Sequence, residues 1–149
     1  MSQNIDNTKK AYQAFAEGDI ATLTDLIAPD CIWHVGGRNQ LAGDYVGHEQ
    51  ILGYFGKLFE LTDGTFTVGL VDLAELPATG LMTCVVTATG TRNGVTLETR
   101  MIELGRSNEQ GQIAECWWFQ EDQYAADEFF GLAQIVLPEQ AKAGASAAV

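Results

Sequence analysis

The chain has 149 residues, enough for one buried core and too few for two domains of ordinary size. Apolar residues make up 46% of it and charged residues 19%, as in globular proteins. The formal net charge of −12 disfavours nucleic acid and membranes as partners, because phosphate backbones and anionic lipids repel an acidic surface.

Helical patterns occupy the first half of the chain. Apolar residues recur there at helical spacing, and Gly18 is placed to end the first helix. Asp19 can cap a second helix, which Pro29 ends. The predicted order is a helix over 4–17, a second helix up to Pro29, a strand at 31–35, a glycine-rich loop at 36–47 and a third helix at 49–61.

Strand patterns follow Gly64, where the period of the apolar residues changes from 3.6 to 2. These segments are rich in Thr and Val, and Asn93-Gly94 is a strong hairpin signal. Four long strands are predicted, at 65–75, 81–91, 95–104 and 112–119. Helices followed by a run of strands indicate an α+β fold with an antiparallel sheet.

The ends of the chain and its cysteines define further expectations. Residues 2–10 are polar and unlike a secretion signal, which predicts a cytoplasmic protein. We expect one domain over residues 1–137 and an Ala-rich tail over 138–149 that is frayed or used in an oligomer contact. The widely spaced cysteines favour buried thiols over disulfides or a zinc site. No nucleotide, phosphate or metal motif is present, so we expect no cofactor and no metal.

Three local patterns carry a resemblance to a known superfamily. They are Phe-Ala-Glu-Gly-Asp with Leu-Ile-Ala-Pro-Asp at 15–19 and 26–30, Leu-Ala-Gly-Asp-Tyr-Val-Gly-His-Glu at 41–49, and Gly-Gln-Ile-Ala-Glu-Cys-Trp-Trp-Phe at 111–119. Together with the order of elements, they resemble the SnoaL-like and ketosteroid-isomerase-like branch of the nuclear transport factor 2-like superfamily over residues 8–130. The resemblance implies a cystatin-like, cone-shaped roll, in which a curved antiparallel sheet packs on three N-terminal helices around one apolar pocket. It also implies a homodimer.

Asp122 is the first candidate for catalysis. It follows the aromatic Trp117-Trp118-Phe119 run at the end of the last strand, where a partly desolvated carboxyl would suit acid–base work. The resemblance also implies a catalytic aspartate near this position, as in polyketide cyclases. The alternative is a solvated Asp122 that caps the helix following it.

His34 is the second candidate. In ketosteroid isomerases the base is a carboxylate near the position of His34 or Val35, and residues 31–35 here contain no Asp or Glu. His34 could take that role, because its unperturbed pKa of about 6.5 suits neutral pH. If Trp33 and Val35 point inward, however, strand alternation turns His34 outward and makes it a surface residue.

Tyr12 and Tyr54 are candidates for an oxyanion hole, in which a hydroxyl stabilises a developing enolate. The resemblance favours Tyr12, since ketosteroid isomerases use a tyrosine of the first helix. Core tyrosines are the alternative for both. Limonene-epoxide-hydrolase-like relatives carry an aspartate two residues after an arginine matching Arg100, and Ile102 stands there, which disfavours epoxide opening.

The predicted pocket holds the remaining candidates. By resemblance, one face of the last strand lines it, so Trp118 and Trp117 cannot both do so. The catalytic candidates are Asp122, His34 and Tyr12, and the substrate-binding candidates are Trp33, Tyr45, Tyr54, Phe55, Arg100, Trp118 and Gln120.

These residues favour an isomerase- or cyclase-type proton transfer on an apolar carbonyl-bearing or polycyclic small molecule. A non-catalytic ligand-binding or dimerisation module is the alternative. A dehydratase or hydrolase that pairs His34 with Asp122 is a third possibility.

Overall fold

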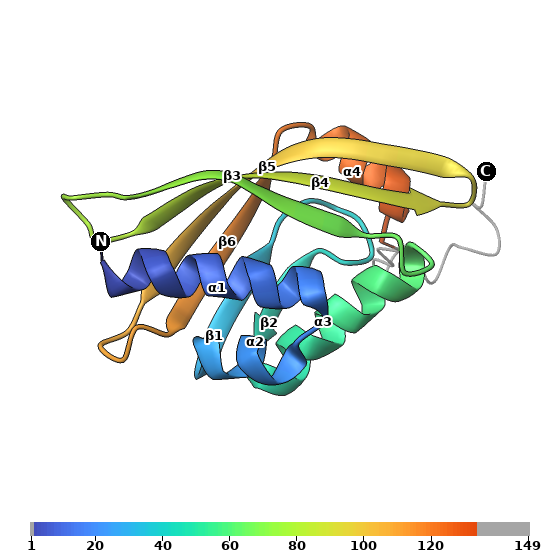
Figure 1. Cartoon of the computed structure of the whole chain (residues 1–149). Coiled ribbons are helices and arrows are strands. Elements are labelled where there is room, and N and C mark those ends of the chain that lie inside the picture. The colour runs from blue at the N-terminus through green and yellow to red at the C-terminus, as the bar shows by residue number, and fades with distance from the viewer. Residues whose placement is uncertain (1, 134–149) are drawn as a thin grey trace, which may run out of the picture.

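The computed structural model of the protein describes residues 2–133 and begins with a helical hairpin (Figure 1). α1 (Gln3–Glu17) starts after Ser2, whose side chain accepts a hydrogen bond from the first turn of the helix. It ends at Gly18, where a φ of 71° favours glycine. The side chain of Asp19 caps α2 (Ile20–Leu26) as predicted.

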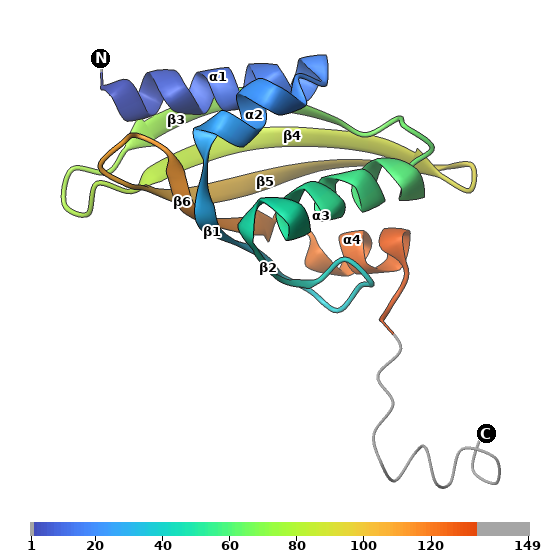
Figure 2. The same cartoon turned by 90° about the horizontal axis from the view of Figure 1, so that it is seen from below.

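A six-stranded curved sheet follows, in the order β2-β1-β6-β5-β4-β3 (Figure 2). Its strands are β1 (Ile27–Val35), β2 (Gly43–Val46), β3 (Thr67–Glu75), β4 (Met82–Arg92), β5 (Val95–Ser107) and β6 (Ile113–Gln120), and the remaining helices are α3 (Gly47–Leu61) and α4 (Gln123–Phe130). The predicted α+β roll with three N-terminal helices is confirmed. One neighbouring pair, β1 with β6, is parallel, and the others are antiparallel.

Two differences from the predicted elements involve β1 and the strands that pair with it. The second helix ends at Leu26 rather than at Pro29, because the chain from Ile27 onward belongs to β1 and pairs with β6. The segment 36–47, predicted as a loop, contains β2, which pairs antiparallel with β1. Both differences arise from pairing with strands distant in sequence, which local patterns do not encode.

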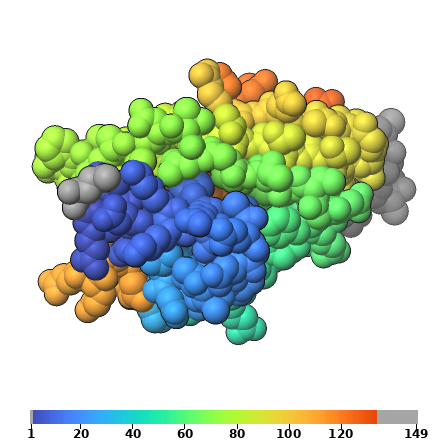
Figure 3. Space-filling view, viewed as in Figure 1, coloured from blue at the N-terminus to red at the C-terminus, as the bar shows by residue number. Residues whose placement is uncertain are grey.

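The helices cover the concave face of the sheet. α1 packs against β3, and α3 packs against β1 (Figure 2). In the space-filling view, the atoms of α1 lie directly against those of β3 (Figure 3). The core between these layers includes the three cysteines, which are buried and free as predicted.

Strand alternation decides which side chains reach this core. On β6, Cys116 and Trp118 are buried against the helices, whereas Phe119 is 51% exposed. Within residues 2–133, no helix is long and apolar enough to cross a membrane. The predicted tail over 138–149 lies outside the described residues, so the domain boundary stays a prediction.

Candidate functional site

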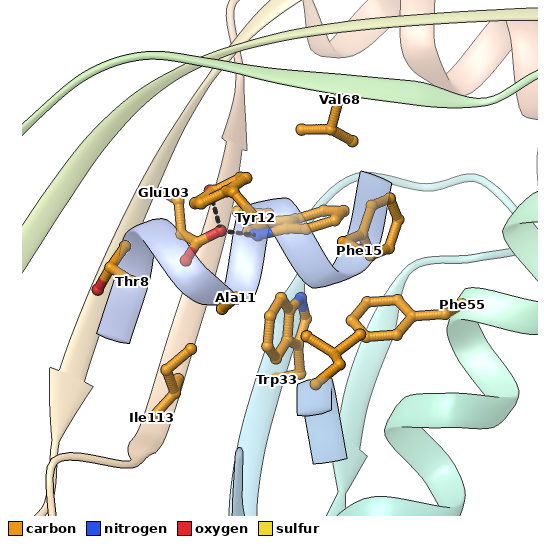
Figure 4. Close-up of a pocket in the computed structure, with 11 residues that line it drawn as sticks. Thr8, Ala11, Tyr12, Phe15, Trp33, Phe55, Val68, Glu103 and Ile113 are labelled. Carbon is orange, nitrogen blue, oxygen red and sulfur yellow. Dashed lines mark hydrogen bonds between the residues drawn. The ribbon is translucent and has the colours of Figure 1, made fainter. Parts of the chain in front are cut away.

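A small cavity of about 30 Å³ lies between α1 and the concave face of the sheet (Figure 4). Its walls are mostly apolar and aromatic. Six of the side chains that line it come from α1, β1, α3, β5 and β6. They are Tyr12, Phe15, Trp33, Phe55, Glu103 and Trp118.

Glu103 places a carboxyl group on the wall of this cavity. Its side chain is buried, since β5 directs it to the same face as Met101, beneath α1. Tyr12 donates a hydrogen bond to Oε2 of Glu103, and Nε1 of Trp118 donates to the same oxygen at 2.7 Å. The other oxygen, Oε1, points away from this pair (Figure 4).

Burial raises the pKa of the Glu103 carboxyl above its ordinary value. The donors Tyr12, Trp118 and Cys116 act in the opposite direction, because they stabilise the carboxylate, but burial is the larger effect. The pKa of the Tyr12 hydroxyl is also raised, first by burial and then by the charge of Glu103. Tyr12 therefore remains a neutral donor that fixes the orientation of the carboxyl group.

Trp33 contributes a hydrogen-bond donor without a partner. Its indole is 4% exposed and lines the cavity, yet its Nε1–H finds no acceptor among the described residues. Leaving a buried donor unpaired costs about 1–3 kcal/mol, and native proteins seldom do so. This N–H group is therefore available to an acceptor atom inside the cavity.

Aromatic rings form the remaining walls. Trp33 meets Phe55 edge to face at a centroid separation of 5.3 Å, and it meets Trp118 at 5.4 Å. Phe15 of α1 closes the other side, 5.2 Å from Phe55. The cavity thus combines one carboxyl and one free indole N–H with surfaces suited to an apolar ring.

Comparison with known families identifies the chain. Residues 8–116 match the SnoaL-like domain. The chain belongs to the SnoaL-like family. An uncharacterized Mycobacterium tuberculosis (strain ATCC 25618 / H37Rv) protein, Rv0034, is 37% identical to it over 70 residues, which are 47% of this chain and 53% of that protein. This SnoaL-like chain therefore aligns with about half the length of its curated relatives.

Solved structures share the SnoaL-like fold over most of the chain. Bal32a, from a soil-derived mobile gene cassette, is 31% identical over 87% of this chain and 97% of its own, with a TM-score of 0.82. A cystatin-like protein of unknown function from Xanthomonas campestris is 33% identical over 86% of this chain and 98% of its own, with a TM-score of 0.79.

Two further structures, below 25% identity, share the fold alone. TerC, crystallised with polyporic acid, is 19% identical over 87% of this chain and 98% of its own, with a TM-score of 0.75. IdmH of Streptomyces antibioticus, a proposed polyketide cyclase, is 23% identical over 85% of this chain and 99% of its own, with a TM-score of 0.66.

Several predicted site residues of this SnoaL-like protein surround the cavity. Tyr12, Trp33, Phe55 and Trp118 line it directly. Tyr54 and Gln120 line a second cavity of about 20 Å³, on the other side of Trp118. Tyr45 donates a hydrogen bond to the carbonyl of Leu41 at 2.7 Å, and its ring lies 4.7 Å from that of Tyr54.

Asp122 and Arg100 lie outside the cavity. Asp122 is exposed and caps α4, where its Oδ1 accepts a hydrogen bond from the N–H of Ala125 at 3.0 Å. Arg100 is exposed and pairs with Glu121 at 2.6 Å.

His34 lies on the outer face of the sheet, opposite Trp33. Its Nδ1 is 2.7 Å from Asp44 and its Nε2 is 2.7 Å from Glu115, while its ring stacks on Trp117 at 5.3 Å. Hydrogen bonding to Glu115 raises the pKa of His34 most, burial opposes this, and Asp44 adds to the rise. His34 therefore does not reach the cavity or Asp122, and it links β1 to its neighbouring strands.

Sequence reasoning missed Glu103. The available signal was a lone acid among the apolar residues Met101, Ile102 and Leu104, at an inward position of the strand. For metal binding, residues 2–133 contain no cluster of three or more His, Cys, Asp or Glu side chains.

Proposed function

We propose that this SnoaL-like protein binds a small apolar molecule with a carbonyl group and catalyses a proton transfer on it. The observation that carries this proposal is the presence of the Glu103 carboxyl and the unpaired Nε1–H of Trp33 on the walls of one apolar cavity. One group can move a proton and the other can hold an oxygen, as isomerase and cyclase chemistry requires.

In this mechanism Glu103, as a carboxylate, removes a proton from the carbon next to the carbonyl group. The C–H bond breaks, its electron pair forms an enolate, and Trp33 donates a hydrogen bond to the negative oxygen. Where the substrate carries a C=C bond next to that carbon, the enolate is a dienolate; return of the proton from Glu103 to its far carbon shifts the double bond into conjugation with the carbonyl group and completes an isomerisation. Alternatively, the enolate carbon bonds to a second carbonyl carbon of the same molecule, whose oxygen then takes the proton, which completes a cyclisation.

The environment of Glu103 supports this role. A carboxylate with a raised pKa is a stronger base than an ordinary one and is better matched to work near neutral pH. Tyr12 and Trp118 hold the group in place through Oε2 and leave Oε1 directed elsewhere. TerC, with polyporic acid, supports the view that the fold accommodates small organic molecules.

A second candidate function is non-catalytic binding of an apolar ligand. It is favoured by the outward positions of Asp122 and His34, two of the predicted catalytic residues, because neither side chain lines the cavity. It would leave Glu103 as a buried polar group that only organises the core. A dehydratase that pairs His34 with Asp122 lacks support, because these side chains have separate partners.

Hydrogen exchange of a simple ketone separates the two candidates. Cyclohexanone in D₂O is incubated with the protein, and loss of its α-hydrogen signal is followed by ¹H NMR. We expect exchange with the wild type and with Glu98→Gln, an exposed change of the same kind on β5, but none with Glu103→Gln. Exchange by Glu103→Gln at the wild-type rate would show the catalytic role to be wrong.

The same assay tests the residues predicted from the sequence. Asp122→Asn and His34→Ala decide whether either side chain takes part in proton transfer. Saturable binding of cyclohexanone without exchange by the wild type would favour the non-catalytic function.

We also propose that two copies of the chain associate through the outer face of the sheet. Val85 and Ile102 are paired across β4 and β5 on the outer face, where Ile102 is 41% exposed, which gives an apolar patch, outside the lining of the groove beside Trp117, able to meet its own copy about a two-fold axis. Light scattering after size exclusion should give a dimer for the wild type and a monomer for Ile102→Arg. A monomeric wild type would contradict this.

A further inference from the structure

The cavity is smaller than the ligands that the proposed function requires. Its volume is about 30 Å³, whereas an apolar cavity that binds benzene measures about 150 Å³. A ring compound can therefore bind beside Glu103 only if a side chain in the wall moves.

Trp118 borders three separate spaces. On one side lies the cavity with Glu103, and on another the second cavity of about 20 Å³. The third is an open groove of about 300 Å³ on the outside, next to Trp117 and Phe119. Among the described residues, Trp118 is the one that borders all three; its backbone lies beside Gly36 and its side chain points inward.

We propose that Trp118 is a movable partition through which the ligand reaches Glu103 from the outer groove, and that its displacement removes a hydrogen-bond donor from this carboxyl group. The chemical class of the ligand rests on the proposed function, whereas the route rests on the arrangement of the three spaces. Trp118 is thus a positioning residue, which acts through Glu103.

The contacts of Trp118 explain how its indole is held in place between the spaces. Its Nε1–H is bonded to Glu103 at 2.7 Å, and its ring lies against Trp33 at 5.4 Å and Tyr54 at 5.9 Å. An apolar ring that displaces the indole can take over the aromatic contacts but not the hydrogen bond. Glu103 then loses a donor that lowers its pKa, so it becomes a stronger base when the ligand is present.

Gly36 lies on the proposed route from the groove. This residue lines both the groove and the second cavity, as do Gln120 and Gln123. A Cβ atom at Gly36 would meet Oε1 of Gln123 at 3.7 Å, an ordinary contact, and the backbone there has no positive φ. Gly36→Val should therefore narrow the passage while leaving the aromatic core intact.

The rate of ligand uptake tests the route. The probe is 4-fluoroacetophenone, whose association and dissociation are measured by ¹⁹F NMR exchange. Trp118→Phe, which removes the bond to Glu103, should speed association about tenfold, as expected for a barrier lowered by one hydrogen bond to a carboxylate. Gly36→Val should slow it. Glu98→Gln, an exposed change on β5 that lies on none of the three spaces, should leave the rate as in the wild type.

A second measurement tests the link to Glu103. A ¹³C NMR titration of the Glu103 carboxyl should show a higher pKa in Trp118→Phe than in the wild type, and the wild-type pKa in Trp117→Phe. Unchanged association rates in both Trp118→Phe and Gly36→Val would overturn the route, even if Glu103→Gln abolishes hydrogen exchange. No saturable binding of the probe to any variant would overturn the route and the ligand class together.

Discussion

Replacing Glu103 by Gln should change the stability of the protein in a way that depends on pH. Burial raises the pKa of the folded Glu103 carboxyl above the ordinary value of 4.5. Between these two values the folded state holds a proton that the unfolded state has lost. The stabilisation that comes from the proton on Glu103 is therefore fully present below pH 4.5. It falls as the pH rises to the folded pKa of Glu103 and is absent above that pKa.

The size of this effect follows from the chemistry of the two side chains. In that window the stability of the wild type should fall by about 1.4 kcal/mol per pH unit. Gln carries no charge at any pH and can still accept from Tyr12 and Trp118, but its buried amide N–H groups cost about 1–3 kcal/mol if unpaired. Glu103→Gln should thus be less stable than the wild type in acid, and the difference should shrink as the pH rises to the folded pKa of Glu103.

Urea denaturation over a series of pH values measures this difference directly. The titration of His34 is common to both proteins and cancels in the comparison. Glu98→Gln, exposed on the same strand, should follow the wild type at every pH. A stability difference between Glu103→Gln and the wild type that is constant with pH would refute the reasoning, because Glu103 would then have no raised pKa.

Three further predictions concern the neighbours of Glu103 and the outer face of the sheet. Tyr12→Phe removes a donor to Glu103, so it should lower the free energy of unfolding by about 1–2 kcal/mol and raise the pKa of Glu103 in a ¹³C NMR titration; an unchanged pKa would contradict this. Phe55→Ala should cost about 3–5 kcal/mol in urea denaturation, because the ring is buried in the cavity wall, and a loss below about 1 kcal/mol would argue against that packing. His34→Gln should be less stable than the wild type below pH 6.5, and this deficit should vanish as the pH rises through the raised pKa of His34; a deficit that persists at high pH would show that charge is not its cause.

Much of the fold could be predicted because the local patterns are strong. The apolar face of α3, the cap at Asp19 and the Asn93-Gly94 turn are all properties of short segments. β2 could not be predicted in this way, since its residues become a strand only by pairing with β1. The same holds for the parallel pairing of β1 with β6.

The candidate site was less predictable because a strand pattern shows which residues share a face but not which face is covered. On β5, Arg100 was predicted to bind the substrate, but it faces outward. Glu103 was not predicted, and it faces inward with Met101. On β1, the sequence did not show whether His34 or Trp33 faces the pocket. The inward face of each strand is the one on which α1 and α3 pack, and this packing is a tertiary property that local patterns do not encode.

The most direct test of the central claim is a crystal structure of the protein with 4-fluoroacetophenone bound. The proposed function predicts the ketone between α1 and the sheet, with its oxygen accepting a hydrogen bond from Nε1 of Trp33 and its methyl carbon facing Glu103. A ketone bound on the outer face beside His34, with the inner cavity closed as it is here, would contradict that function.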